Sequence, residues 1–197
     1  MTELEKTDAL QLLKRQGLAP LPPAAFVHEF VDYLKDKESR PGHVDDRPRA
    51  GIRHYRMEDV MAAPGFLELA KGLNRAASTY FEEPAILWSL NVYTTDPDTP
   101  HVRGITGLHQ DGEAPKILTL FMLCEDTPAD AAQLFVPKDA DRSDRWYAMY
   151  GAAGTCWLAD TSMPHLGLIP RDRRRTIAWA RWANVLPDAA AGLPRVA

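Results

Sequence analysis

The sequence has few of the features that would assign a protein to a class at once. Only two cysteines occur among its 197 residues, and both Cys124 and Cys156 lie in apolar runs, where reduced core residues are typical and a disulfide framework is not. No apolar run reaches the roughly 18 residues that a membrane-spanning helix needs, and Met1–Glu5 is acidic rather than arranged as a signal peptide. These absences predict a single domain in the cytoplasm.

The sequence also lacks an excess of charge of one sign. It holds 23 Lys and Arg against 27 Asp and Glu, for a net charge of −4. This balance argues against nucleic acid or an anionic membrane as a partner, and a small molecule is the partner we expect. Internal repeats and low-complexity segments are absent as well, and the composition, 45% hydrophobic, is sufficient for one core. The sequence does not indicate an oligomeric state.

The sequence that is present divides by its periodicity into two parts of one domain over residues 1–197. Residues 1–83 carry apolar side chains at helical spacing, which predicts a helical preface with a charged, mobile loop over Lys35–Gly51. Residues 84–187 form short runs rich in aromatic and branched side chains, separated by Gly, Pro and Asp, which predicts strands. Residues 188–197 are predicted to be a flexible tail. The predicted strands are Ala85–Tyr93, Lys116–Leu123, Gln133–Val136, Trp146–Tyr150, Thr155–Ala159 and Thr176–Val185.

At least six strands after a helical preface predict a mainly β fold, a jelly roll or barrel buttressed by helices on one face. The run Ile117–Leu123, "ILTLFML", is apolar at nearly every position. Such a strand is covered on both sides, which predicts an interior pocket on one face and the helices on the other.

A polar triplet, His109-Gln110-Asp111, precedes this apolar run. In a strand, residues i and i+2 point to the same face, so His109 and Asp111 are predicted to aim at one point. The sequence contains a second triplet of this type, His43-Val44-Asp45, in the charged loop, with no strand after it. We interpret the second triplet as a solvated surface feature.

Two further signals follow the first triplet. His165 comes 54 residues after Asp111, at the end of a strand and a polar turn, and Arg174 and Arg175 come nine and ten residues later. Two histidines and one carboxylate can form a facial triad, which leaves metal positions open for reactants and is typical of non-haem Fe(II) oxygenases. Zinc is the next metal to consider. The downstream arginine favours iron with a carboxylate-bearing co-substrate over zinc, because a planar guanidinium binds a carboxylate through two hydrogen bonds.

This order of His-x-Asp, His and Arg resembles the Fe(II)/2-oxoglutarate-dependent dioxygenase superfamily over about residues 84–185, and it is similar to the phytanoyl-CoA dioxygenase and prolyl-hydroxylase-like branches. The resemblance implies a double-stranded β-helix (jelly roll, cupin-like) in which His109, Asp111 and His165 hold Fe(II). It implies a hydroxylase that consumes O2 and the co-substrate 2-oxoglutarate and releases succinate and CO2. No catalytic side chain beyond the metal ligands is implied. The carboxylate of Asp111 favours hydroxylation, because the family's halogenases carry a small residue there.

The resemblance also implies residues that hold 2-oxoglutarate, and two registers of the last strand stay open. The preferred one uses Arg174 and turns Thr176, Ala178 and Ala180 inward, since this pattern resembles the family's final strand. The other uses Arg175 and turns Ile177, Trp179 and Arg181 inward, which resembles the oxidative nucleic-acid demethylases. Tyr93, with Asn91 two residues before it, matches a position from which the family often donates a hydroxyl to 2-oxoglutarate.

The substrate is less well indicated than the chemistry. We expect a small carboxylated metabolite or an amino acid, with the loop Thr94–Gly107 as a candidate lid in which His101 or Arg103 meets an acidic group. His28 and His54, in the helical part, are interpreted as structural. The alternatives are an oxidative nucleic-acid demethylase, which would need a basic, aromatic lid, and a non-catalytic metal-binding β-helix protein.

Overall fold

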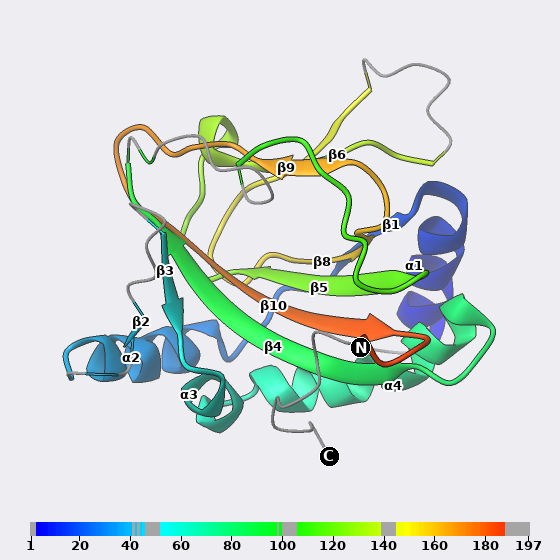
Figure 1. Ribbon diagram of the computed structural model, residues 1–197, viewed down its shortest axis with the longest axis horizontal. Helices are drawn as coiled ribbons and strands as arrows, with labels where there is room; N and C mark the ends of the chain where they lie inside the picture. The colour runs from blue at the N-terminus through cyan, green and yellow to red at the C-terminus, as the bar shows by residue number, and fades with distance from the viewer. Residues whose placement is uncertain are drawn as a thin grey trace.

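Two β-sheets and four helices make up the fold of the computed structural model, which describes residues 3–40, 42, 44–45, 52–97, 99, 106–138 and 145–187. The larger sheet has seven strands in the order β1-β8-β5-β10-β4-β3-β2, and the smaller has three in the order β7-β6-β9. The helices α2, α3 and α4 lie along one face of the larger sheet, and β6 and β9 lie over the other (Figure 1). The predicted double-stranded β-helix with helices on one face is confirmed.

The strands pair antiparallel throughout. The helices are α1 (Glu3–Gln16), α2 (Val27–Glu38), α3 (Met57–Ala62) and α4 (Phe66–Phe81), with a short 3-10 helix at Ala129–Ala131. The strands are β1 (Leu18–Leu21), β2 (Val44–Asp45), β3 (Ile52–Tyr55), β4 (Ile86–Thr95), β5 (Ile117–Leu123), β6 (Gln133–Phe135), β7 (Tyr147–Met149), β8 (Cys156–Asp160), β9 (His165–Gly167) and β10 (Arg175–Ala183).

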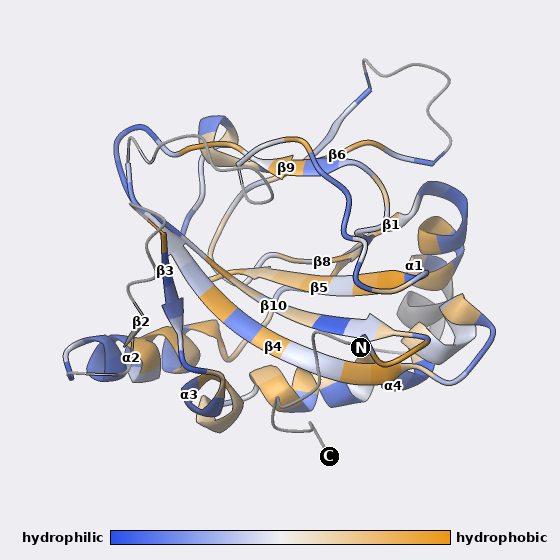
Figure 2. Cartoon of the chain, in the orientation of Figure 1, coloured by the Kyte–Doolittle hydropathy of each residue, from blue (hydrophilic) through white to orange (hydrophobic). Residues whose placement is uncertain are grey.

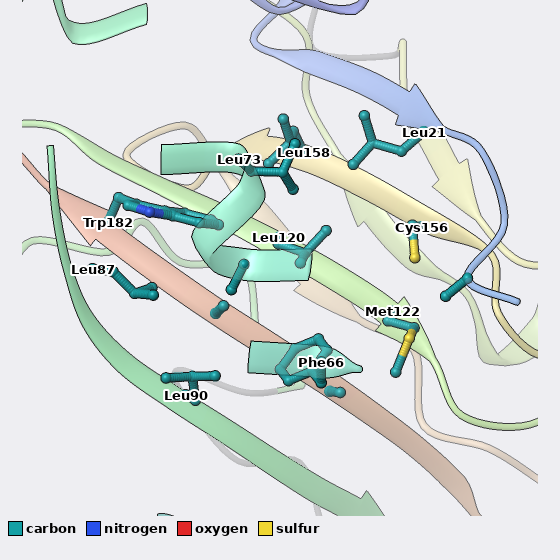
Figure 3. Close-up of a cluster of buried hydrophobic side chains, with 14 of the residues drawn as sticks. Leu21, Phe66, Leu73, Leu87, Leu90, Leu120, Met122, Cys156, Leu158 and Trp182 are labelled. Atoms are coloured by element: carbon teal, nitrogen blue, oxygen red, sulfur yellow. The ribbon is translucent and has the colours of Figure 1, made fainter. Parts of the chain in front are cut away.

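The main core lies between the helices and the larger sheet. Helix α4 buries Phe66, Ala70 and Leu73 at the spacing of one helical face, and these side chains meet Leu120 and Trp182 from the sheet. Figure 3 shows this contact, with residues of α4 packed over β5, β10 and β4. Hydrophobic and hydrophilic residues are interleaved along α2 and α4 (Figure 2), as expected of helices with one packed face.

Strand β5 is buried at every position, as its apolar run predicts. Leu118, Leu120 and Met122 belong to the core beneath the helices, whereas Phe121 and Leu123 belong to a second cluster on the opposite face of the sheet. The strand therefore separates the helix-packed core from the interior between the two sheets, where the polar triplet lies.

The prediction that residues 1–83 are helical is wrong in part. Strands β1 and β3 lie within this segment and pair with β8 and β4 of the larger sheet. Strand β1 contains Pro20 and is only four residues long, so its sequence has no clear alternation of period two. The charged loop also begins later than predicted, because α2 continues to Glu38.

The structure also corrects the preferred register of the last strand. Ala178, Ala180 and Trp182 pack in the core under the helices, while Ile177 and Trp179 belong to the interior cluster. The sequence of β10 is apolar on both faces, and a slip of one residue turns every side chain to the opposite face. The interior row is therefore Arg175, Ile177, Trp179 and Arg181, the register that was not preferred.

No helix among the described residues combines the length and the apolarity that crossing a bilayer requires. Several predictions concern residues outside the described ranges. These are His43 of the second triplet, His101 and Arg103 of the candidate lid, and the tail over 188–197.

Candidate metal centre

The two histidines of the predicted triad lie side by side on neighbouring segments. His165 begins β9, and His109 pairs with it through an isolated antiparallel bridge. The bridge has two backbone hydrogen bonds, from His109 N to His165 O at 3.0 Å and from His165 N to His109 O at 2.9 Å. This pairing places the two ring centroids 4.1 Å apart. The triplet thus joins the edge of the smaller sheet. Its position in the sequence suggested instead that it would continue into β5.

Both imidazole rings are oriented by the same kind of hydrogen bond. The Nδ1 atom of His109 lies 2.8 Å from the carbonyl oxygen of Gly107, and that of His165 lies 2.9 Å from the carbonyl oxygen of Met163. Since a carbonyl only accepts, each Nδ1 carries the proton and donates it. Each Nε2 is then left with a lone pair, which is the arrangement of metal-binding histidines.

Asp111 completes the group. One donor atom each from His109, Asp111 and His165 lies within 4.8 Å of the other two, and His109 Nε2 is 3.7 Å from Asp111 Oδ1. The second carboxylate oxygen, Oδ2, is 2.9 Å from Nη2 of Arg181. Two imidazoles and one carboxylate that converge on one point fit a divalent metal with open positions, and they suit Fe(II).

The electrostatics of His165 favour its neutral, metal-binding form. Burial lowers the pKa of His165 to about 4, with further lowering by His109 and Arg181, while Asp111 and the Met163 carbonyl act in the opposite direction. The ring is therefore uncharged near neutral pH and does not need to lose a proton before it binds a metal.

Arg175 is the most unusual charged residue of the structure. It is 1% exposed, and its Nη1 donates to the carbonyl oxygens of Ala131 and Ala132 at 2.7 and 3.3 Å. Its Nε and Nη2 atoms make no hydrogen bond of good geometry within the described residues, although the Tyr93 hydroxyl lies close to the guanidinium. Burial lowers its pKa, which the neighbouring Tyr93 opposes. A buried guanidinium with free N–H groups is costly unless a ligand completes its hydrogen bonds.

Arg174 lies on the other side of the sheet. Its guanidinium is 3.0 Å from Glu38 Oε1 at the end of α2, and Glu38 also bonds Arg53 and Tyr55. Together these contacts tie α2 to β3 and β10. The structure therefore does not bring Arg174 to the triad, in contrast to the preferred prediction, because β10 has the other register.

Tyr93 and Asn91 both face the interior, as predicted. Tyr93 lines a cavity of about 90 Å³ beside the two histidines, together with Phe121, Trp179 and three polar residues. Asn91 Nδ2 lies 3.0 Å from Nδ1 of His54. The full lining of this cavity, which we call the central cavity, is His54, Tyr93, His109, Phe121, Gln133, His165, Trp179 and Arg181.

Three polar residues of the central cavity were missed or misread in the sequence. His54 was interpreted as structural because its strand, β3, was read as part of a helical segment. Gln133 is 3% exposed, and its Oε1 has no partner among the described residues; a lone polar residue at the start of an apolar strand was the available signal. Arg181 was considered only in the register not preferred.

The structural class of this protein follows from its fold and its site. It is a double-stranded β-helix with two histidines and an aspartate at the rim of the smaller sheet. A scan against protein-family models finds no match to this sequence, and a search of the curated proteins finds none either. The search of solved structures does find similar folds. All of those described below are less than 20% identical to this chain, so they show the fold alone.

One similar structure is the non-haem alpha-ketoglutarate-dependent epimerase SnoN from nogalamycin biosynthesis, with 17% identity over 93% of this chain and 84% of that chain, and a TM-score of 0.68. Another is the carbocyclase SnoK from the same biosynthesis, with 14% identity over 99% and 92% and a TM-score of 0.67. HygX from Streptomyces hygroscopicus, solved with nickel and 2-oxoglutarate, is 13% identical over 94% and 88%, with a TM-score of 0.66.

Proposed function

We propose that this protein is an Fe(II)- and 2-oxoglutarate-dependent oxygenase of the superfamily that its sequence resembles. In this proposal, His109, Asp111 and His165 hold the iron, and the interior next to them holds 2-oxoglutarate. The proposal is supported by the convergence of the three donor atoms and by the fold shared with enzymes whose structures contain Fe3+ or nickel together with 2-oxoglutarate.

The observation that carries the proposal is the set of free polar atoms around Arg175. Its directly paired neighbour on β4 is Thr95, which is fully buried and whose hydroxyl also has no partner among the described residues. Tyr93 connects this place to the metal centre, since it neighbours Arg175 and lines the central cavity. A buried cation beside a free hydroxyl group is an environment that suits the far carboxylate of a dicarboxylic acid.

When bound, iron and 2-oxoglutarate would supply the oxidising chemistry, in which O2 and 2-oxoglutarate are consumed and CO2 and succinate are released. The residues of the chain position these reactants. His109, Asp111 and His165 would hold the metal and would leave positions on it open for reactants. Phe121 and Trp179 give the central cavity an apolar part of its lining. No side chain needs to act as a general base.

We further propose a small-molecule substrate and hydroxylation as the outcome. The similar structures support the first point, since one contains nogalamycin RO and another contains hygromycin B. A carboxylated metabolite or an amino acid remains our proposed class, and Asp111 supports hydroxylation over halogenation because it fills the position that a halide would need. Epimerisation and cyclisation are the reactions in the names of two similar structures, so product analysis must separate them.

Two features favour a nucleic-acid demethylase, namely the spacing of Asn91 and Tyr93 and that of Arg175 and Arg181, and the register of β10 turns both arginines inward. However, Arg181 is engaged by Asp111 and Glu113, at 2.9 and 3.2 Å, and the chain has a net charge of −4. A basic groove is needed to hold the phosphates of a nucleic acid. We therefore retain the small molecule as the proposed substrate.

The test is a screen of small metabolites for succinate formation that depends on the protein, Fe(II) and 2-oxoglutarate. We expect one class of carboxylated compound to stimulate succinate release, with a product heavier by one oxygen atom in mass spectrometry. A product of unchanged mass, or one lighter by two hydrogens, would instead indicate epimerisation or cyclisation. Metal binding without any 2-oxoglutarate binding would contradict the proposal and favour a non-catalytic metal-binding protein.

A further inference from the structure

A single turn between β8 and β9, residues 161–163, contacts the backbone of Asp111, the side chain of Gln110 and the ring of His165. Its three consecutive carbonyl oxygens each accept one hydrogen bond from the ligand segments. Thr161 O accepts from the backbone N–H of Asp111 at 2.8 Å. Ser162 O accepts from Gln110 Nε2 at 2.9 Å, and Met163 O accepts from His165 Nδ1 at 2.9 Å. We call residues 161–163 the ligand turn.

The conformation of the ligand turn is set by the carboxylate of Asp160, the last residue of β8. One oxygen, Oδ1, accepts from the backbone N–H of Ser162 at 3.1 Å and from the hydroxyl group of the same residue. The backbone carbonyl of Asp160 accepts from Met163 N at 3.1 Å. These bonds close the turn on itself. Asp160 is only 6% exposed, so its carboxylate depends on protein donors rather than on water.

The other carboxylate oxygen of Asp160 is anchored from outside the turn. Oδ2 accepts from the Tyr80 hydroxyl at 2.6 Å and from Lys138 Nζ at 2.6 Å. Tyr80 belongs to α4, whereas Lys138 follows β6, and Lys138 also contacts the Tyr80 hydroxyl. Burial, the hydrogen bond to Asp160 and its charge raise the pKa of Tyr80, so this hydroxyl remains a donor at any working pH.

We infer that Tyr80, Asp160 and Lys138 are positioning residues for the metal centre, which act through the ligand turn and touch neither metal nor substrate. The inference rests on the proposed metal site and assigns it a support that reaches to α4. Asp160 orients the ligand turn, and the turn in turn orients the His165 ring and the backbone of Asp111. Loss of the anchor should therefore lower metal affinity and change the geometry of the ligands.

The physical reason is that a metal ligand binds well only when its lone pair is held in the binding direction. Residues that orient ligands by a hydrogen bond typically contribute about 10- to 100-fold to metal affinity. Here one carboxylate fixes a turn that serves two of the three ligands. The effect of Asp160 should reach this range, although it lies one step further from the metal than the carbonyl groups do.

The test compares Tyr80→Phe and Asp160→Asn with the wild type, and Tyr55→Phe is the matched control. Tyr55 also donates its hydroxyl to a carboxylate, that of Glu38 at 3.1 Å, but Glu38 bonds Arg53 and Arg174 instead of the ligand turn. Co(II) is the probe, because its visible absorption reports how its ligands are arranged. Calorimetry gives the dissociation constant, and thermal unfolding of the metal-free proteins gives stability.

We expect Asp160→Asn to weaken Co(II) binding by about 10-fold or more and Tyr80→Phe by about 2- to 10-fold, the value of one hydrogen bond. Both variants should shift the Co(II) absorption. Tyr55→Phe should lose similar thermal stability and keep the affinity and spectrum of the wild type. If Asp160→Asn does not fold, Tyr80→Phe decides the question alone.

Two results would overturn the inference. One is wild-type affinity and spectrum in Tyr80→Phe and in Asp160→Asn. The other is a loss in Tyr55→Phe as large as that in Tyr80→Phe, since affinity would then follow general stability. In both cases the wild type still binds Co(II) and His165→Ala does not, so the metal centre itself stands. Failure of the wild type to bind Co(II) would overturn the metal centre and this inference together.

Discussion

Two adjacent residues, Arg174 and Arg175, show that the surroundings of a side chain decide whether it can bind a carboxylate ligand. The Arg174 guanidinium has a carboxylate partner in Glu38 and lies partly exposed on the side of α2. The Arg175 guanidinium has no carboxylate partner within the described residues and lies buried next to Tyr93, which lines the central cavity. A free carboxylate ligand should therefore bind to Arg175.

We predict that Arg175→Gln raises the dissociation constant for 2-oxoglutarate by about 10- to 100-fold, because a hydrogen bond between charged groups contributes about 1.5–3 kcal/mol. The matched control is Arg174→Gln, which removes the same charge from the next position and should leave this constant within about twofold. Calorimetry in the presence of Ni(II) measures both. A larger effect of Arg174→Gln would show that the co-substrate is held on the other face of the sheet.

At the metal, the prediction concerns His165. His165→Ala removes a buried ligand whose lone pair is already oriented by the Met163 carbonyl, so Fe(II) binding and succinate formation should both be lost. His28→Ala is the control, because His28 lies exposed on α2. We expect the control to match the wild type in both measurements. Full activity of His165→Ala would exclude it as an iron ligand.

At the scale of elements, α2 is tied to the larger sheet by one acidic residue near its end. Glu38 bonds Arg174, which immediately precedes β10, and it also bonds Arg53 and Tyr55 of β3. Burial by itself would raise the pKa of Glu38, but the hydrogen bonds and charges of Arg174, Tyr55 and Arg53 outweigh burial, so the pKa is lowered. The charged form is therefore stabilised by folding.

We predict that Glu38→Gln destabilises the protein by about 1–2 kcal/mol at pH 7, an estimate reduced for the partial exposure of the group. A lowered pKa gives stability that is fully present above the ordinary value of 4.5 and is lost as the pH falls through the lowered value. The difference between variant and wild type in urea unfolding should thus shrink below pH 4.5. A difference that stays constant down to pH 3 would contradict the role of the charge.

For the whole molecule, the residues proposed to bind the metal and 2-oxoglutarate lie on both sheets. His165 belongs to the smaller sheet, and Arg175 belongs to the larger one. A metal with 2-oxoglutarate bound to it would join them, and a ligand that binds only the folded state stabilises that state by mass action. The stability of the complete fold should therefore depend on both the metal and 2-oxoglutarate.

We predict that Ni(II) with 2-oxoglutarate, each near 100 times its dissociation constant, raises the melting temperature by about 10–20 °C, since each of the two ligands contributes about 2.7 kcal/mol. Asp111→Gly should lose most of this rise, because one charged ligand is gone. Differential scanning calorimetry measures both proteins. An equal rise in Asp111→Gly would place the metal elsewhere.

Local patterns were sufficient to predict the fold type and to select His109, Asp111 and His165, which the structure brings together. The change from helical spacing to short apolar runs is a local property, and so is the spacing of His-x-Asp. The second triplet was set aside on local grounds as well, because no strand follows it. The run Ile117–Leu123 could likewise be predicted to be a strand buried on both faces, because it is apolar at nearly every position.

The tertiary structure alone decided which of the two arginines faces the interior and that His54 lines the central cavity together with His109 and His165. The strand around Arg174 and Arg175 is apolar on both faces, so its pattern is compatible with both registers. The choice depends on pairing with β4 and β5 and on Glu38, which lies 136 residues away from Arg174 in sequence. His54 depends in the same way on the pairing of β3 with β4. Contacts between distant segments leave no periodic signal in either segment, because each is stabilised by the other and not by its own pattern.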